Sequence, residues 1–431
     1  MTTTSFRILL TGAVGALLIG CGGGPSDAPQ ATQPAPTSQK ITLSGIVTDN
    51  PIVNASVMVR VADAAFGDSP PTGSNGEFSV EISSNTPSAL ITAEAFDAVN
   101  GVKLSAVLDT YSAFAGKARN GVVNGVMITN VTTALQILAE QLAADGRIDS
   151  FGEYHDLAGQ VDAGELFELA AALKVVIENI DGSVLPSGIE DTAQLARMIA
   201  AGESSFLADV AVATPGALDE ARDRLLTDGN ATLPFTPDST PGVYRSINDQ
   251  FIYAVFADGS ALVDNLDDNA VPGTPSWSLN SAGQLVVRYI GFERETDSLT
   301  AIGEVGDVMH MVRQSDFGNA VATDADGVRK HAFGPAYDAA QVPGSWIDGA
   351  METSRWVFEA GGTGYRINTQ TQLQSDDFSW SVTAHGRIDM AFDGTDESMQ
   401  FARLGDDDTV LQISRFNGLY AYLDISTLTQ E

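Results

Sequence analysis

The sequence predicts a multidomain protein that is mainly β, with a central α-helical bundle between an N-terminal β-sandwich and a C-terminal antiparallel meander or barrel region built from two repeats. Three observations predict this class. Apolar and polar residues alternate between residues 41 and 96, as they do in half-buried strands. Helical periodicity follows, from about residue 105 to 228. Beyond residue 240, four segments recur at an offset of 102 or 103 residues, which indicates a duplicated unit.

The first twenty residues have the features of a signal peptide. Arg7 is their only charged side chain, and the apolar run ILLTGAVGALLIG follows it. This run is too short to cross a bilayer, which needs roughly 20 residues, but it suits a signal-peptide core. Leu18-Ile19-Gly20-Cys21 resembles the lipobox of bacterial lipoproteins, and Cys21 is the single cysteine of the chain. The resemblance implies that residues 1–20 are removed and that Cys21 is lipidated, with palmitate among the acyl chains.

The residue after the cysteine bears on the location of the protein. It is Gly22 rather than Asp, and by the same resemblance this implies sorting to the outer membrane, with the protein facing the periplasm or the cell surface. Residues 21–39 are rich in Gly, Pro, Ser, Thr and Gln, with Asp27 as their only charge. A segment of this composition cannot bury enough apolar surface to fold, so we expect a flexible tether.

The chain is strongly acidic. It has 22 basic and 56 acidic residues, a net charge of −34, and removal of Arg7 with the signal peptide leaves 21 against 56, or −35. Phosphate backbones repel such a chain, so we expect no nucleic-acid partner. Anionic headgroups repel it as well, so we expect membrane contact through the N-terminal lipid alone.

Residues 40–102 predict a small β-sandwich. Three segments carry a recognisable pattern: Gly45-Ile46-Val47, then residues 51–57 (PIVNASV), then residues 72–78 (TGSNGEF). They are similar to the Gly-x-Val, Pro-Ile/Val-x-x-Ala-x-Val and Thr-x-x-Asn-Gly-x-Phe segments of the carboxypeptidase regulatory-like family. The resemblance implies a prealbumin-like sandwich that serves as a spacer or interaction module, without peptidase activity.

Residues 103–230 predict a helical bundle. Thr133 is expected to cap a helix, because Gln136 lies three residues later at the spacing of a capping box. Leu135, Leu138 and Leu142 share one face of that helix. The leucine stripes indicate a bundle core, and a groove for a partner is the alternative.

Residues 241–335 and 342–431 form the two repeats. PGVYRSI from Pro241 matches PGSWIDG from Pro343, and the segments around Trp277 and Trp380 match as well. Period-two patterning and hairpin turns predict antiparallel meanders. The pattern resembles the lipocalin-like domains of small bacterial proteins, which implies barrels. The sequence leaves open whether there is one barrel or two, and whether the interior is hollow or filled.

Four residues of the repeats are candidate ligand-binding residues. Trp277 recurs as Trp380, and Arg313 recurs as Arg415. On one face of its strand, Arg313 follows Met309 and Met311, and Arg415 follows Leu411 and Ile413 in the same way. In a barrel, this face would be the interior. There an arginine can meet an acidic group of a ligand. The alternative is that the tryptophans pack in the core and the arginines form structural ion pairs.

No catalytic residue, cofactor site or metal site is predicted. The four histidines, His155, His310, His331 and His385, lack zincin spacing, and no Gly-x-Ser-x-Gly elbow is present. The acidic stretch from Asp324 to Gly327 starts like a calcium loop but lacks the later ligands.

The sequence therefore predicts a non-enzymatic, lipid-anchored envelope protein that binds or scaffolds. Its expected partners are the membrane, through the lipid, and envelope proteins or glycans. Two alternatives stay open. One is a lipocalin-type binder of a lipid or an acidic small molecule. The other is an envelope glycan hydrolase that uses carboxylates not singled out among the 56 acidic residues.

Overall fold

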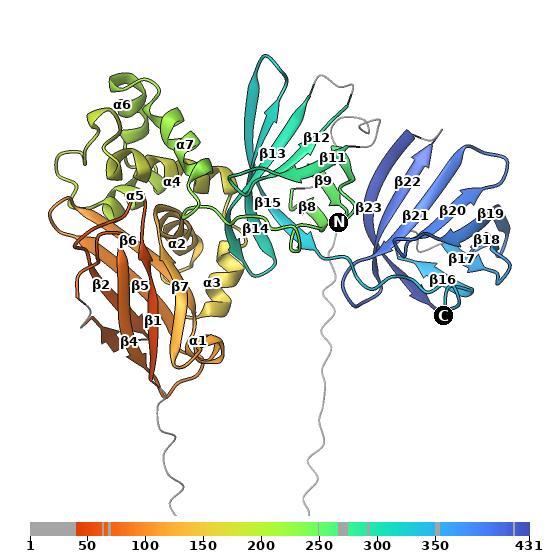
Figure 1. Ribbon diagram of the computed structural model, residues 1–431, viewed down its shortest axis with the longest axis horizontal. Helices are drawn as coiled ribbons and strands as arrows, with labels where there is room; N and C mark the ends of the chain where they lie inside the picture. Colours follow the sequence, from red (N-terminus) through yellow and green to blue (C-terminus); the bar gives the residue numbers. More distant parts are fainter. Residues whose placement is uncertain are drawn as a thin grey trace, which may run out of the picture. The chain divides into compact units, whose positions relative to one another are not determined.

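The computed structural model confirms the predicted class: a mainly β chain with helices in its middle and two eight-stranded barrel-like sheets in its C-terminal region (Figure 1). It describes residues 40–62, 64–67, 70–248, 250–265, 275–290, 294–349, 354–416 and 419–431. The predicted signal peptide, the tether and Cys21 lie outside the described residues. None of the helices within these ranges is long and apolar enough to cross a membrane.

Two sheets form the N-terminal sandwich. In the first, β1 (Lys40–Val47) pairs antiparallel with β4 (Glu77–Ser83) and parallel with β7 (Val122–Ile128). The second sheet has the order β3-β2-β5-β6, with β2 (Ser56–Val61), β3 (Ala64–Phe66), β5 (Leu90–Asp97) and β6 (Val102–Thr110). Alternate residues are buried, such as Val57, Val59 and Val61 of β2, and they form the core between the sheets.

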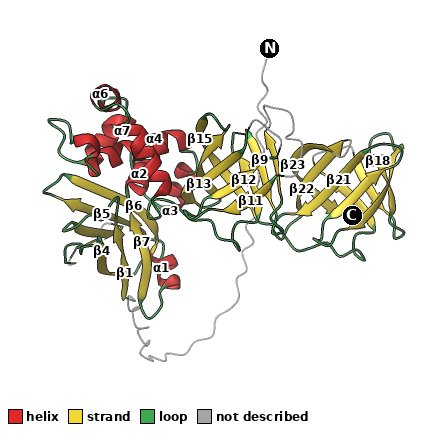
Figure 2. Cartoon of the chain, turned by 45° about the horizontal axis from the view of Figure 1, so that its top comes forward, coloured by secondary structure: helices red, strands yellow, loops and turns green. Residues whose placement is uncertain are grey.

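The strands of the sandwich continue beyond residue 102, where the sequence suggested that helices begin. β6 and β7 complete the two sheets, and only the short helix α1 (Tyr111–Lys117) lies between them. The segments VKLSAVLDT and VVNGVMI are rich in β-branched residues, which favour strands. The remaining helices follow β7 and gather together in Figure 2: α2 (Asn130–Leu142), α3 (Phe151–Ala158), α4 (Ala163–Ile177), α5 (Thr192–Ala200), α6 (Phe206–Ala213) and α7 (Ala217–Thr227).

Helix α2 begins earlier than expected, and the predicted cap at Thr133 is wrong. Thr129 is the N-cap: its hydroxyl accepts from the Thr132 N–H at 3.1 Å, and the Thr132 hydroxyl accepts from the Thr129 N–H at 2.9 Å. Thr133 lies one turn inside the helix, where its hydroxyl accepts from the Ser105 N–H at 2.8 Å. Its polar group therefore joins the helix to β6.

The repeats form two barrels rather than one. Barrel one comprises β8 (Gly242–Ser246), β9 (Phe251–Val255), β10 (Ala261–Asn265), β11 (Ser276–Leu279), β12 (Leu285–Arg288), β13 (Thr296–Val305), β14 (Val308–Asp316) and β15 (Val321–His331). It is a meander in which β15 returns to pair with β8, and its end strands β10 and β11 meet through the pair Ser260 and Ser276.

Barrel two is closed by ladder pairing throughout. It comprises β16 (Gly344–Asp348), β17 (Ser354–Phe358), β18 (Thr363–Asn368), β19 (Gln374–Val382), β20 (Ile388–Phe392), β21 (Glu397–Arg403), β22 (Thr409–Phe416) and β23 (Leu419–Gln430). Each strand pairs with its neighbours in the chain, and β16 pairs with β23. Closure leaves no free sheet edge to pair with another chain.

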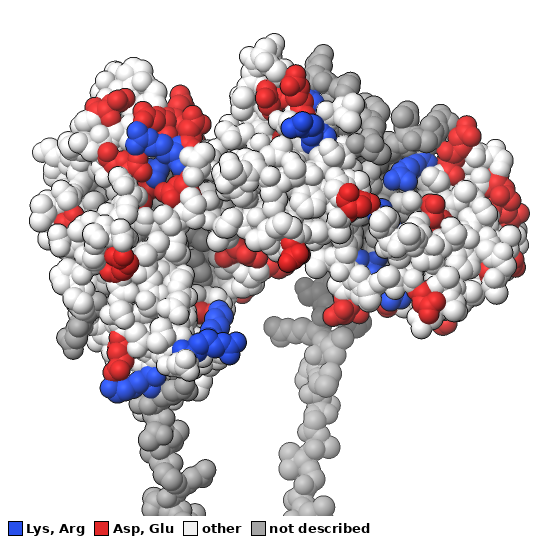
Figure 3. Space-filling view, viewed as in Figure 1, with Lys and Arg blue, Asp and Glu red and all other residues white. Residues whose placement is uncertain are grey.

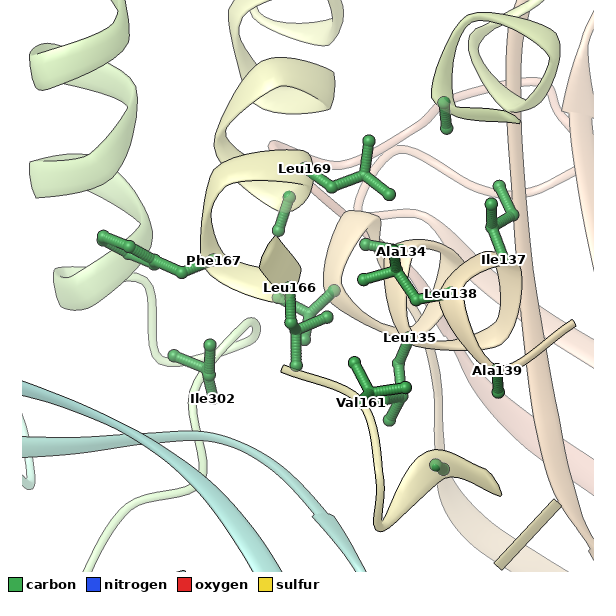
Figure 4. Packing of buried hydrophobic residues seen from close by; sticks show 14 of the residues in the cluster. Ala134, Leu135, Ile137, Leu138, Ala139, Val161, Leu166, Phe167, Leu169 and Ile302 are labelled. Carbon is green, nitrogen blue, oxygen red and sulfur yellow. The ribbon is translucent and has the colours of Figure 1, made fainter. Parts of the chain in front are cut away.

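Apolar clusters join the modules. Ile302, on the outer face of barrel one, belongs to the same cluster as Leu166 and Phe167 of the helices (Figure 4). Val312, on the same outer face, belongs to this cluster as well. A second cluster contains outer-face residues of both barrels, namely Val243, Ile252, Ala254 and Leu262 of barrel one and Ala402, Leu411 and Ile413 of barrel two. Burial of such surface contributes about 25 cal/mol per Å², so both junctions stabilise the folded chain.

Candidate functional site: the polar end of barrel one

The two repeated tryptophans occupy equivalent places. The indole N–H of Trp277 donates to the Phe256 carbonyl at 2.6 Å, and that of Trp380 donates to the Glu359 carbonyl at 3.1 Å. Their backbone N–H groups donate to Gly259 at 2.9 Å and Gly362 at 2.7 Å. Both side chains are half-buried at the edge of their barrel cores. Each tryptophan therefore stabilises, through hydrogen bonds, the seam where the third and fourth strands of its barrel meet.

Arg313 faces the interior of barrel one. It lies on β14 on the same face as Met309 and Met311, which belong to the barrel core. Its Nη2 donates to Asp324 Oδ2 at 2.9 Å, and its guanidinium carbon lies 4.9 Å from the centroid of the Phe251 ring. A cation over an aromatic face is attracted by the ring quadrupole. The charge is thus engaged by a carboxylate and a ring within the protein.

Arg415 lies on the outer face of barrel two, so the expectation that both arginines face a barrel interior is wrong for this residue. On β22, Gln412 pairs with Phe401 and Ser414 pairs with Met399. Phe401 and Met399 both belong to the barrel core. Alternation then turns Arg415 outward, and its positive charge helps burial to lower the pKa of Arg387. Adding the sequence offset of 102 to Arg313 gives Arg415, but the inward-facing positions of β22 are Gln412 and Ser414. The sequence match is therefore shifted by an odd number of residues, and an odd shift reverses the face of a strand.

A buried carboxylate organises the end of barrel one at which Arg313 lies. Asp297 is completely buried at the start of β13. Its Oδ2 accepts from the hydroxyls of Tyr253 at 2.6 Å and Tyr289 at 2.5 Å, and from Arg294 Nη1 at 3.4 Å. Its Oδ1 accepts from the Ser315 hydroxyl at 2.6 Å. Residues from β9 and β14, and Tyr289 directly after β12, thus converge on one carboxyl group of β13.

The donors around Asp297 are held in their protonated form. Burial is the main cause that raises the pKa of Tyr253 and of Tyr289, and the neighbouring charge of Asp297 adds to it. Both phenols therefore remain donors at any ordinary pH. A carboxylate whose oxygens accept from four donors is well placed to hold strands together and poorly placed to take a proton from a substrate.

No motif in the sequence pointed to this buried carboxylate centre, although one signal for it exists. Asp297, Leu299 and Ala301 share one face of β13, and the last two are in the barrel core. A carboxylate on an otherwise apolar strand face requires buried partners. Those partners come from other strands, so their identity follows only from the register of the barrel.

A groove of about 740 Å³ lies next to this end of the barrel, between the helices and β14–β15. Its helical wall includes Asp162, Glu168, Asp219, Arg222 and Asp223, and its barrel wall includes Gln314, Thr323 and Asp324. Arg222 is paired with Glu168 at 2.5 Å and with Asp219 at 2.6 Å. Basic side chains set among acidic ones are visible over α7 in Figure 3. The groove carries an excess of negative charge and offers amide and hydroxyl groups.

The acidic stretch from Asp324 to Gly327 is part of strand β15, not a loop. Asp324 is paired with Arg313, and Asp326 accepts from the side chains of Ser246 and Asn248. Across the residues that the structure describes, no three His, Cys, Asp or Glu side chains are grouped to hold a metal ion.

Comparison with known proteins adds no family to these observations. No family model matches the chain. No curated protein matches it either. The case for a function therefore depends on the residues and their geometry.

Proposed function

We propose that the protein is a non-enzymatic, lipid-anchored protein of the outer membrane that acts as a scaffold and binds envelope proteins or glycans through its outer surface. The observation that supports this most directly is the filling of both barrels. Tyr244 and Tyr253 in barrel one, and Trp356 and Phe378 in barrel two, are almost completely buried in the barrel cores. A filled barrel serves as a solid module, whereas a ligand container needs a cavity.

The junctions between the modules support the same proposal. Outer faces of the barrels are used for packing: barrel one contacts the helices through Ile302 and Val312, and contacts barrel two through Val243 and Ile252. The Leu423 N–H of barrel two also donates to Asp264 of barrel one at 2.8 Å. A scaffold benefits from such contacts, because they fix the spacing between the surfaces that it presents. The acidic groove beside α4 and α7 is the proposed binding face.

The filled barrels lead to a direct test against the lipocalin-type alternative. We expect a fluorescent fatty acid such as cis-parinaric acid, titrated into the purified full-length protein, to give no saturable signal at one or two equivalents. The physical reason is that its chain would have to displace packed aromatic side chains. Saturable binding at one equivalent per barrel, with quenching of tryptophan fluorescence, would contradict the scaffold proposal and favour the small-molecule binder.

The anchor is tested by Cys21→Ser. A serine hydroxyl is a much weaker nucleophile than a thiolate, so the variant should not be lipidated. We expect wild type to fractionate with the outer membrane, and we expect the variant either to leave the membrane fraction or to remain as an uncut precursor. A Cys21→Ser protein that is fully processed and still found in the outer-membrane fraction would show that the anchor is not at this residue.

A further inference from the structure

A buried lysine lies among three carboxylates where the sandwich meets the helices. Lys174, in the middle of α4, is 2% exposed, and Asp49, in the turn after β1, is completely buried. The Lys174 Nζ lies 2.5 Å from Asp49 Oδ1, 2.7 Å from Glu178 Oε1 and 3.3 Å from Asp228 Oδ2. Lysine and aspartate are 125 residues apart in the chain.

Lys174 and Asp49 differ in how completely their polar atoms are hydrogen-bonded. Asp49 uses Oδ1 for Lys174, while its Oδ2 is buried without a hydrogen-bond partner among the described residues. Burial raises the pKa of Asp49 to about 7, although Lys174 opposes the shift. Burial also opposes the charge of Lys174, but the carboxylates of Asp49 and Glu178 outweigh it and raise its pKa. The pair is therefore a lysine ammonium held against a carboxyl group that is easily protonated.

We propose that Lys174 and Asp49 condense spontaneously into an isopeptide bond, with Glu178 carrying a proton between the reacting groups. The geometry supports this because the nucleophile, Lys174 Nζ, already contacts both the carboxyl group of Asp49 and the proposed proton carrier, Glu178. Fixing two reactants side by side in the fold gives a very high effective concentration. Exclusion of bulk water protects the product from hydrolysis.

The step balances without any co-reactant. One proton of the ammonium passes to Asp49 Oδ1 along the existing hydrogen bond, which leaves a neutral amine. The nitrogen lone pair then attacks the Asp49 carboxyl carbon, and Glu178 takes a second proton from Nζ. Glu178 returns this proton to Oδ1 as the carbon–oxygen bond breaks, so one water leaves. Oδ2 becomes the amide oxygen, and the last proton stays on the amide nitrogen.

The charges that remain after condensation have partners of their own. Glu178 Oε2 accepts from Arg224 Nη1 at 2.6 Å, independently of Lys174. Asp228 is 17% exposed and accepts from the Asn230 N–H at 2.9 Å. Burial of two opposite charges is costly, and condensation removes that cost by converting them into a neutral amide. This shifts the equilibrium toward the product relative to the same groups in water.

The bond would link the sandwich to the helices covalently. With one cysteine in the sequence, the chain cannot form an internal disulfide. An isopeptide bond between the turn after β1 and helix α4 would keep these two parts together even when the surrounding structure opens. The folded chain would gain resistance to unfolding in this way.

Peptide mass spectrometry tests the proposal on the full-length protein. Trypsin cuts after Lys40, Arg60, Arg147, Lys174 and Arg197. We expect wild type to yield peptide 41–60 joined to an uncut peptide 148–197, one water lighter than the two together. Free peptide 41–60, recovered from folded protein together with peptides 148–174 and 175–197, would overturn the proposal.

Three variants assign the roles. Lys174→Met removes the nucleophile and should abolish the cross-linked species. Glu178→Gln keeps the side-chain size but cannot carry the proton, so we expect at least a tenfold loss of cross-linked product with an unchanged circular dichroism spectrum. Full cross-linking in Glu178→Gln would overturn the role of that residue. Lys103→Met is the control, because Lys103 belongs to the more exposed pair with Glu94, and it should cross-link as wild type does.

Discussion

Replacing Trp356 by alanine is expected to lower the free energy of unfolding of barrel two by about 3–5 kcal/mol, the range for large aromatic residues removed from a core. Trp356 is completely buried at the centre of the barrel. Its ring lies 5.8 Å from Phe378 and 6.3 Å from Phe401, centroid to centroid, and its indole N–H donates to Asp348 at 3.3 Å. Alanine would leave a cavity that these rings cannot fill and would remove one hydrogen bond to Asp348.

The measurement is chemical unfolding of the full-length protein, followed by near-ultraviolet circular dichroism. Trp380→Ala is the matched control, since this tryptophan is half-buried at the seam of the same barrel. We expect a clearly smaller loss for Trp380→Ala, because water can reach part of the vacated space. Equal losses for the two variants would contradict the view that the barrel is organised around Trp356.

The strand pattern of the repeats was predictable because a barrel needs what the sequence displays. Alternate residues must face a filled core, and turns must separate the strands, so period two and Asp-Gly turns are visible without a structure. The repeat also indicated that Trp277 and Trp380 occupy equivalent places, and their indole hydrogen bonds at the strand seam agree with this. At the two tryptophans, the sequence repeat and the hydrogen bonds of the structure therefore agree.

Arg313 and Arg415 show that a sequence repeat does not determine which face of a strand a residue occupies. The match of VMHMVR with VLQISR is a match of residue types, and it contains no information about the register of each strand against its neighbour. In barrel one, Arg313 pairs with Leu299 and faces inward, whereas in barrel two Arg415 pairs with Ser398 and faces outward. A difference of one residue in strand phase is invisible in a sequence offset but decides which face a charge occupies.

The cap of α2 fails for a related reason. Thr129, Thr132 and Thr133 all have side chains that can cap a helix, and sequence spacing favoured Thr133 through Gln136. The structure places the Thr133 hydroxyl 2.8 Å from the Ser105 N–H of β6, so a tertiary hydrogen bond uses the side chain that local rules assigned to the cap. The same holds for Asp49 and Lys174, whose contact joins residues too distant in the chain for any local pattern to connect.

Replacing Asp297 by alanine should destabilise barrel one by about 3–5 kcal/mol, the cost of removing one partner from a buried charged network. The substitution would remove the carboxylate that accepts from the hydroxyls of Tyr253, Tyr289 and Ser315 inside the barrel. Each unsatisfied buried donor costs about 1–3 kcal/mol. Unfolding of the full-length variant in denaturant, followed by tyrosine and tryptophan signals, measures the loss.

The control for Asp297 is Asp307→Ala, in the turn between β13 and β14 of the same barrel. Asp307 also pairs with an arginine, Arg329, but both side chains are more than half exposed, so its removal should cost less than about 1 kcal/mol. A second comparison separates hydrogen bonding from packing: Tyr253→Phe and Tyr289→Phe, added to Asp297→Leu, remove two of the three hydroxyls together with the carboxylate. Because polar groups are costly only when their partners are missing, the triple variant should recover part of the stability that Asp297→Ala loses. If Asp297→Ala were as stable as wild type, the hydroxyls would have found other acceptors, and the carboxylate would not be what holds this end of the barrel together.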